Sequence, residues 1–529
     1  MDPLVAAAYN DHFYTTLLGT PALVLVCYVA YSFFFHPLAG LPGPLRAKIG
    51  LGGWLTARAF KRDVGWELAK LHEEHGRLVR VGRNTVSAVD PDAVIELYRY
   101  GSAFEKSKFY SFFKVSKPSL LATLPNQAHN LARRGVAPAF AMNVVVQLEE
   151  LVDQCFEDLC ATFDGQIASN GGKASIDGSL WFHFLALDTV GEVAFGKSFG
   201  LCKTGKDSDD LLPMLDAYTA SSCTSGTQPW AHRILHWYIT RNLGSSGAAA
   251  LGAKARKAVA HRLEQAEKAE DDGASLREDV LSKLLKSKGP DGSPLTAEQI
   301  MVQANSILGA GSDTTSITMR ALLSYIIGSP VVYKKVMDEL ESAIDGGTAA
   351  IPLSYADGKK LDYFQACVKE TLRLHPAVGW LLPRIVPKGG VVLAGYHLPA
   401  GTEIGMSPYV YHRRSEAFGP DAAVFRPERW LDADEEERKV LERNLITFGA
   451  GQRVCIGKNI ALMELTKVVP QLLYRYKLSF TPRSPTSPHT LPGQGVDGKQ
   501  SDDQPWHCES QWFTHQRDFW VDVETRALV

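Results

Sequence analysis

The ten residues from Phe448 to Gly457, FGAGQRVCIG, constrain this chain more than any other stretch. Their glycines clear space on both sides of Cys455, and an apolar helical pattern follows from Ile460 to Leu473. Zinc and iron–sulfur sites need several clustered protein ligands, and no second cysteine or histidine lies near Cys455 in the sequence. A single thiolate suits haem iron, because the porphyrin supplies the in-plane bonds. The alternative is a glycine-rich turn around a buried structural cysteine.

Charge and cysteine usage exclude some classes of protein. The 529 residues carry a formal net charge of −2, which gives no reason to expect a nucleic-acid partner. The eight cysteines are scattered and form no C-x-x-C pair. We therefore expect a reducing compartment for the main body and no disulfide framework.

The N-terminal segment predicts a membrane anchor. Tyr14–Phe35 contains no charged residue and is close to the roughly 20 apolar residues that a membrane helix needs. Asp2 and Asp11 precede this span, and basic residues such as Arg46 and Lys48 follow it, so the main body should face the cytosol. A cleaved signal peptide lacks support, because no positive n-region and no clear cleavage site are present. A buried hairpin of a soluble protein is the other alternative.

The remaining patterns divide the chain into three predicted parts. Residues 1–35 are the anchor, residues 36–50 are a proline-rich hinge, and residues 51–529 are the catalytic domain. Within this domain, short strands are expected at 78–82 and 85–89, and a buried helix at 180–195. Residues 104–121 are expected to form an irregular loop with several aromatic side chains. The polar tail after Ser484 precedes a possible closing strand near 512–516.

A long apolar helix is expected from Thr296, where Gln299 completes a capping box, to about Ile327. Its interior holds the run GAGSDTT at 309–315, and each interior glycine costs about 1 kcal/mol relative to alanine. Close approach of a flat cofactor and a local distortion of the helix would explain why glycine is present despite this cost. Helix–helix contact through small residues is the alternative.

Two charged motifs precede the cysteine loop. Glu370 and Arg373 lie on one helical face at i and i+3, which by itself indicates a surface pair. His129 and Arg133 share a helical face at i and i+4. Arg384 lies near the entry of a predicted strand.

Together these motifs resemble the cytochrome P450 haem-thiolate monooxygenases, over nearly the whole chain. The pattern F-x-x-G-x-R-x-C-x-G matches from Phe448 to Gly457, and A/G-G-x-D/E-T matches from Ala310 to Thr314. Glu370 and Arg373 match the E-x-x-R motif, with Arg429 as the arginine that joins them in the family. His129 and Arg133 match the W/H-x-x-x-R element.

The resemblance implies a mainly α fold with a smaller β part, which is the cytochrome P450 fold, preceded by one transmembrane helix. It implies a haem b cofactor whose iron is bound by the Cys455 thiolate, and proton delivery by Asp313 and Thr314. The residues expected to bind the cofactor are His129, Arg133, Arg384, Phe448, Gly449, Gly451, Arg453 and Gly457. Among them, the cationic residues are candidates for the two haem propionates, because a buried carboxylate needs cationic partners.

The implied activity is insertion of one oxygen atom from O2 into a hydrophobic small molecule, as in fungal secondary metabolism. No Rossmann or flavin motif is visible in the chain, so electrons are expected from a membrane-bound NADPH-cytochrome P450 reductase. The expected location is the endoplasmic reticulum membrane, with a single span and the catalytic domain in the cytosol. The alternatives are an isomerase or dehydratase of the same fold that does not use O2, and a non-catalytic membrane-tethered haem protein. The identity of the substrate does not follow from the sequence.

Overall fold

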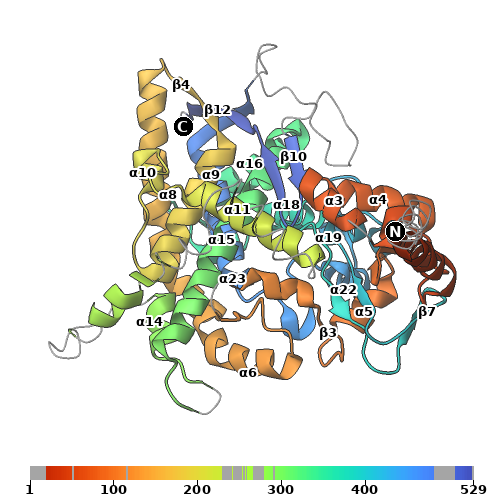
Figure 1. Cartoon of the computed structure of the whole chain (residues 1–529). Coiled ribbons are helices and arrows are strands. Elements are labelled where there is room, and N and C mark those ends of the chain that lie inside the picture. The colour runs from red at the N-terminus through yellow and green to blue at the C-terminus, as the bar shows by residue number, and fades with distance from the viewer. Residues whose placement is uncertain are drawn as a thin grey trace, which may run out of the picture.

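A 31-residue helix, α15 (Ala297–Ile327), crosses the helical part of the computed structural model (Figure 1). It begins with the expected capping box, in which Thr296 Oγ1 accepts a hydrogen bond from the Gln299 N–H and Gln299 Oε1 accepts one from the Thr296 N–H. It ends at Gly328, directly before Pro330 starts the next helix. The predicted length and caps are confirmed.

The structure describes residues 20–50, 53–114, 117–228, 279–289, 292–481 and 507–526, and parts of 237–268. Helices predominate among these residues. They are α2 (Leu45–Ile49), α3 (Trp54–Lys61), α4 (Val64–His75), α5 (Pro91–Tyr98), α6 (Asn126–Val136), α7 (Met142–Val145), α8 (Glu149–Ser169), α9 (Gly178–Val190), α10 (Leu201–Thr204), α11 (Leu211–Thr227), α14 (Val280–Leu285), α15, α16 (Pro330–Asp345), α17 (Tyr355–Gly358), α18 (Asp362–Leu374), α19 (Pro408–Tyr411), α20 (Ser415–Phe418), α21 (Glu428–Asp432), α22 (Glu435–Asn444) and α23 (Lys458–Arg475).

The strands form small sheets beside the helices. A five-stranded sheet has the order β1-β2-β8-β5-β3, a three-stranded sheet has the order β4-β12-β9, and two hairpins pair β6 with β7 and β10 with β11. The strands are β1 (Leu78–Gly82), β2 (Thr85–Ala88), β3 (Glu105–Lys106), β4 (Lys173–Asp177), β5 (Arg384–Ile385), β6 (Val391–Leu393), β7 (Tyr396–Leu398), β8 (Glu403–Gly405), β9 (Tyr476–Phe480), β10 (His507–Ser510), β11 (Thr514–Arg517) and β12 (Trp520–Thr525). The expected mainly α fold with a smaller β part is confirmed.

Two apolar cores hold these layers together. The larger core lies among α8, α9, α15, α16, α18 and α23, and the smaller one joins the N-terminal helices to the five-stranded sheet. Helix α15 contacts both α9 and α23, and it forms one wall of the cavity described below (Figure 1). The helix expected at 180–195 is present as α9 and a following π-helical turn, η5 (Gly191–Phe195).

One segment that was expected to be irregular contains regular structure. The loop expected at 104–121 contains strand β3 and a 3-10 helix, η2 (Lys108–Phe113), so the prediction of an irregular loop is wrong there. The aromatic side chains Phe109, Tyr110 and Phe113 pack inward from η2, and this burial fixes a segment without clear sequence periodicity. Most of the polar tail lies outside the described residues, and the closing strand is β11.

The N-terminal part has an apolar helix at Thr20–Phe35, shorter than a full membrane span, and residues before Thr20 lie outside the described part. Most of its apolar side chains are exposed, with Leu23 63% and Phe34 77% exposed, whereas Ser32 is buried. By length and composition one described segment, Asn126–Ser169, could cross a membrane, and α15 with α16 would be a second if the bent pair is taken as one span. Apolar residues of α8, α15 and α16 belong to the larger core.

The Glu370 carboxylate organises the turns that lead to the cysteine loop. It accepts hydrogen bonds from Arg373 at 2.7 and 2.9 Å, from the Trp430 indole at 2.9 Å and from Arg429 at 3.4 Å. Arg373 also donates to the carbonyl oxygens of three residues in the 412–424 segment. Both Glu370 and Arg373 are fully buried, so this is an internal network rather than a surface pair. The predicted association with Arg429 is confirmed.

Removing one partner from such a network leaves a buried charge uncompensated. We expect Arg373→Met to lower the free energy of unfolding by about 3–5 kcal/mol, measured by chemical denaturation. The control is Lys334→Met, which breaks an exposed ion pair with Asp338 and should cost less than about 1 kcal/mol. Equal losses in the two variants would contradict an internal role for Arg373.

Candidate functional site

The loop before α23 presents the Cys455 thiol to an internal cavity. The Cys455 N–H donates to the Phe448 carbonyl oxygen at 2.7 Å, and the Val454 N–H donates to the Gly451 carbonyl oxygen at 3.2 Å. Gly451 has φ 59°, and a Cβ there would lie 2.2 Å from the Tyr98 carbonyl oxygen, so only glycine fits. These contacts fix the loop as a tight turn ending at the start of α23.

The sulfur of Cys455 lies in a mixed electrostatic environment. Burial raises the pKa of the thiol, whereas the backbone N–H groups of Gly457 and Lys458 and the charge of Arg133 lower it. A Cβ on Gly457 would lie 3.9 Å from Sγ, so glycine keeps the space beside the sulfur open. The donors therefore suit a thiolate only when a positive partner, such as a metal ion, compensates for its burial.

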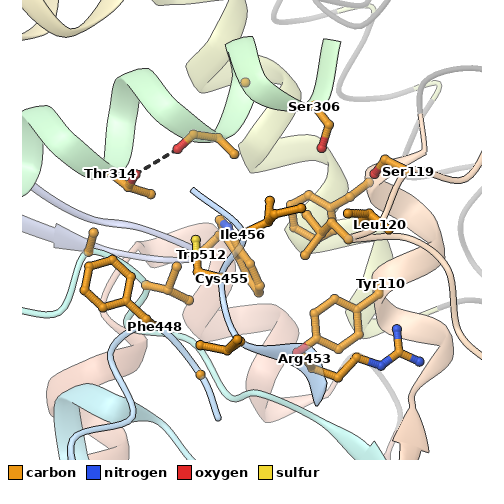
Figure 2. A pocket seen from close by; sticks show the side chains of 18 of the residues that line it. Tyr110, Ser119, Leu120, Ser306, Thr314, Phe448, Arg453, Cys455, Ile456 and Trp512 are labelled. Atoms are coloured by element: carbon orange, nitrogen blue, oxygen red, sulfur yellow. Dashed lines mark hydrogen bonds between the residues drawn. The ribbon is translucent and has the colours of Figure 1, made fainter. Parts of the chain in front are cut away.

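The cavity in front of Cys455 has a volume of about 300 Å³. Figure 2 shows Cys455 and Phe448 on one wall and the side chains of Ser306 and Thr314 on the facing wall, which is α15. Aromatic residues such as Tyr110 and Trp512 close the cavity beside these walls. A flat ligand between the Cys455 loop and α15 would thus contact the sulfur on one face.

Basic side chains gather at one edge of this cavity. They are Lys106, His129, Arg133, Arg384 and Arg453. Among the described residues that line the cavity, none is Asp or Glu. Burial and the neighbouring arginines hold the pKa of Lys106 well below its usual range, which shows how poorly this positive charge is compensated.

The backbone positions these basic groups. Arg133 donates to the Val454 carbonyl oxygen at 2.6 Å, and Arg453 donates to the Thr123 and Leu124 carbonyl oxygens at 2.7 and 2.6 Å. Arg384 donates to the Pro383 carbonyl oxygen at 3.0 Å. Each guanidinium is held in place without a carboxylate partner in the cavity.

This donor set fits the group expected from the sequence. A single sulfur lies on one face, and the described residues contain no group of three or more His, Cys, Asp or Glu side chains that could hold a metal ion without it. The uncompensated basic edge suits a ligand with two carboxylates, since buried cations are stabilised by anionic partners. Haem b combines an iron that accepts one thiolate with two propionates.

Most of the predicted site residues meet at this cavity. Those that line it are His129, Arg133, Arg384, Phe448, Gly449, Arg453, Cys455 and Thr314. Gly451 and Gly457 shape the loop behind it. Asp313 does not line the cavity.

Asp313 lies on the opposite side of α15, where it is 2% exposed. Its Oδ1 is 3.2 Å from His183 Nε2 on α9 and 3.9 Å from His515 Nε2 on β11, and its Oδ2 has no hydrogen-bond partner among the described residues. Burial, together with Asp216, raises the pKa of Asp313 to about 7, against the opposing charges of Arg320 and Arg517. Burial also lowers the pKa of His183 to about 3, so the contact joins two neutral groups between about pH 3 and pH 7.

The glycines of α15 have different roles. Gly309 lines the cavity with open space above its Cα, as expected for approach of a cofactor. A Cβ on Gly311 would lie 2.9 Å from Val190 of α9, so Gly311 serves helix packing instead. The expected distortion is not seen, because α15 is a continuous α-helix in which the Thr314 hydroxyl donates to the Ala310 carbonyl oxygen at 2.8 Å (Figure 2).

Sequence reasoning missed several groups of this site. Lys106 lies in the aromatic segment beside Lys108, Lys114 and Lys117, and nothing in the sequence distinguishes it from these other lysines. Trp430 follows Arg429 directly, but nothing in the sequence indicates its bond to Glu370. His183 and His515 are far from Asp313 in the sequence, and only the fold brings them together.

Comparison with known proteins agrees with this geometry. The family model described as cytochrome P450 matches residues 42–496. The chain is 31% identical to the cytochrome P450 monooxygenase cicH of Emericella nidulans, over 95% of this chain and 98% of that protein. It is 30% identical to the cytochrome P450 monooxygenase gsfF of Penicillium aethiopicum, over 95% and 97% of the two chains. It is also 30% identical to pisatin demethylase of Fusarium vanettenii, over 88% and 89%.

The environment of Asp313 predicts a pH dependence of stability. Its folded-state pKa of about 7 exceeds the ordinary value of 3.8, so the folded protein keeps a proton that the unfolded chain releases between these values. The contribution of protonated Asp313 to the free energy of unfolding is therefore at its maximum below about pH 4, and it is lost as the pH rises towards 7.

We expect Asp313→Asn to remove this loss. The free energy of unfolding is measured with denaturant at pH 5 and pH 8. Its decrease between these two pH values should be larger in the wild type than in Asp313→Asn by on the order of 2–4 kcal/mol. Asp338→Asn, at an exposed ion pair on α16, is the control and should keep the wild-type slope. An unchanged slope in Asp313→Asn would show that Asp313 is ionised in the folded protein.

Proposed function

The chain belongs to the cytochrome P450 family of haem-thiolate monooxygenases, and on this premise we propose which of its residues hold the haem and handle protons. We propose Cys455 as the thiolate ligand of the iron of haem b. The observation that carries this assignment is a single sulfur facing a cavity whose edge is basic and whose lining, among the described residues, has no acidic group. When bound, the haem supplies the oxygen chemistry, in which one atom of O2 enters the substrate.

We further propose that the basic edge binds the propionates. Arg133 and Arg453 are fixed by backbone carbonyl groups and keep N–H groups for a ligand, and Lys106 adds a third charge. Burial and the charge of Arg453 lower the pKa of His129 to about 3, so it acts as a neutral hydrogen-bond donor. Phe448, Gly449, Gly451 and Gly457 shape the loop around the sulfur.

Proton delivery is assigned to Thr314 and Asp313. The Thr314 hydroxyl faces the cavity and can pass a proton at Oγ1, while its bond to the Ala310 carbonyl oxygen fixes its position. Asp313 holds a proton near neutral pH on the far side of α15, because its pKa is about 7. Because Asp313 is the neighbour of Thr314 on α15, we propose it as the proton reserve for Thr314.

We propose single-pass anchoring in the endoplasmic reticulum membrane, with residues 1–35 as the anchor, 36–50 as the hinge and 51–529 as the cytosolic catalytic domain. Outward-facing apolar side chains on Thr20–Phe35 support the anchor. The C-terminal end of the anchor contacts the rest of the chain, since the buried Arg80 of β1 donates to the Ser32 carbonyl oxygen at 3.1 Å and the Tyr28 hydroxyl donates to the Ile49 carbonyl oxygen of the hinge at 2.7 Å. These contacts would fix the direction of the anchor relative to the catalytic domain.

The proposed redox partner is NADPH-cytochrome P450 reductase in the same membrane. The proposed docking charges are Lys458, which starts α23 directly after the Cys455 loop, and Arg134 on α6. Fungal secondary metabolism is the proposed setting, because the relatives compared are fungal monooxygenases and a fungal demethylase.

The ligand assignment is tested by the carbon-monoxide difference spectrum of the reduced protein. We expect the red-shifted Soret band of a thiolate-bound haem in the wild type and its loss in Cys455→Ser. Cys367→Ser is the control, because Cys367 is buried in α18 and outside the cavity, and it should keep the band. A haem-loaded wild type without this band would refute Cys455 as the ligand.

The anchor is tested by deletion of residues 1–26, which keeps Tyr28 and Ser32 and their contacts with the catalytic domain. We expect the truncated protein in the supernatant after a high-salt wash and ultracentrifugation, because the exposed apolar side chains from Leu23 to Val26 are gone. The full-length protein should remain in the membrane pellet, and both should give the same carbon-monoxide spectrum. Retention of the truncated protein in the pellet would contradict the proposed anchor.

A further inference from the structure

One polar side chain of the cavity has no partner in the protein. Asn305 lies on the cavity face of α15, one helical turn before Gly309, and is 8% exposed. Its Oδ1 atom is buried and makes no hydrogen bond with any described residue, so it reaches a ligand only if the amide turns towards the cavity about χ2. Leaving a buried amide oxygen unpaired costs about 1–3 kcal/mol, so a ligand that donates a hydrogen bond there gains a strong advantage.

Further hydroxyl groups lie near this end of the cavity. Ser306 follows Asn305 on α15, Ser119 comes from the segment before α6, and Thr219 comes from α11. In Figure 2 the Ser306 side chain descends from α15 on the side where Ser119 lies. The Lys117 ammonium also lines the cavity but is paired with Glu298 at 2.5 Å. With Lys117 paired, the hydrogen-bonding groups at this end are uncharged and suit a neutral polar group.

Another part of the cavity lining is a fixed aromatic surface. Trp512 packs against Phe113 with ring centroids 4.7 Å apart and against Phe109 at 5.7 Å. Phe109 in turn stacks on Trp380 at 5.5 Å with an interplanar angle of 8°. Since each ring is held by another ring, the wall presents flat surfaces in set orientations.

The tyrosine hydroxyl groups of the cavity are already engaged. Tyr110 OH accepts a hydrogen bond from Arg384 at 3.3 Å, and Tyr218 OH donates to the Phe113 carbonyl oxygen at 2.6 Å. These residues offer a ligand mainly their ring surfaces. Paired aromatic rings gain about 0.5–1.5 kcal/mol beyond the burial of their area, which favours an aromatic ligand over a saturated one.

We propose that the substrate is an aromatic ring system with a free hydroxyl group, with the ring against Phe113 and Trp512 and the hydroxyl donating to Asn305 Oδ1. This inference rests on the proposed function of the same cavity and names its substrate class. Asn305 is a specificity residue, because it determines which ligands bind and takes no part in the oxygen chemistry.

The test uses three probes of similar shape: 2-naphthol, naphthalene and decahydro-2-naphthol. Their dissociation constants for the full-length, haem-loaded protein are measured by isothermal titration calorimetry. We expect 2-naphthol to bind about tenfold more tightly than naphthalene, which lacks the hydroxyl, and several-fold more tightly than the saturated alcohol.

Two kinds of variant separate the contributions. Asn305→Leu, and Asn305→Ala as a second variant, should abolish the preference for 2-naphthol over naphthalene and leave naphthalene affinity nearly unchanged. Phe113→Leu should weaken both aromatic probes several-fold and spare the saturated alcohol. Asn170→Leu, at an exposed turn after α8, is the matched control and should keep the wild-type preferences.

Equal affinities for 2-naphthol and naphthalene in the wild type, or a preference that survives both Asn305 variants, would overturn the proposal. Tightest binding of the saturated alcohol would overturn its aromatic part. The carbon-monoxide spectrum of each preparation is recorded in parallel. A normal spectrum with no probe preference refutes the substrate class alone, whereas an absent thiolate band refutes the ligand assignment irrespective of probe binding.

Discussion

The geometry of the cysteine loop depends on the hydrogen bonds that the buried Glu370 carboxylate accepts. The carboxylate holds Arg373, whose guanidinium binds the carbonyl groups of the 412–424 segment. The His412 ring extends this network, since it contacts the Arg373 carbonyl oxygen through Nδ1 and accepts the Ile446 N–H through Nε2 at 3.0 Å. The Thr447 hydroxyl then donates to the Leu372 carbonyl oxygen at 2.6 Å. Helix α18 is thereby joined by successive hydrogen bonds to the residues just before Phe448, and this fixes the sulfur of Cys455 relative to the core.

Helix α15 separates two different environments. Its cavity face carries Asn305 and Thr314 among mainly apolar neighbours, and its opposite face carries Asp313 between two histidines. A buried carboxyl group with a raised pKa is costly, and such costs are typical of functional sites rather than of structural ones. Asp313 is thus next to the cavity-lining Thr314 in the sequence, but its carboxyl group is packed away from the cavity. The packing of Gly311 against Val190 permits this arrangement, because it brings α9 and His183 close to α15.

Features encoded by neighbouring residues were predictable, and features that depend on distant packing were not. The capping box at Thr296 and the helix that follows it are local, and so is the spacing of the Cys455 loop. The pair Glu370 and Arg373 looked like a surface pair from its spacing alone, and the family resemblance was needed to place it with Arg429. His183 and Trp430 could not be assigned, because their partners come from elements far away in the sequence. Lys106 could not be assigned because its burial beside Arg133, Arg384 and Arg453 depends on the fold. The aromatic segment at 104–113 lacked periodicity since its order comes from burial against Trp512 and Trp380.

The basic edge of the cavity links cofactor binding to the stability of this part of the fold. Lys106 is buried, its ammonium donates to the Leu121 carbonyl oxygen at 2.7 Å and it lies 4.5 Å from the centre of the Tyr110 ring. These neutral partners compensate only part of the desolvation cost, and Arg133, Arg384 and Arg453 add repulsion. A ligand with two carboxylates would attract these cations. Its binding would therefore increase the stability of the packing between β3, α6 and the Cys455 loop. The charges proposed to bind the cofactor would therefore be fully compensated only when the cofactor is bound.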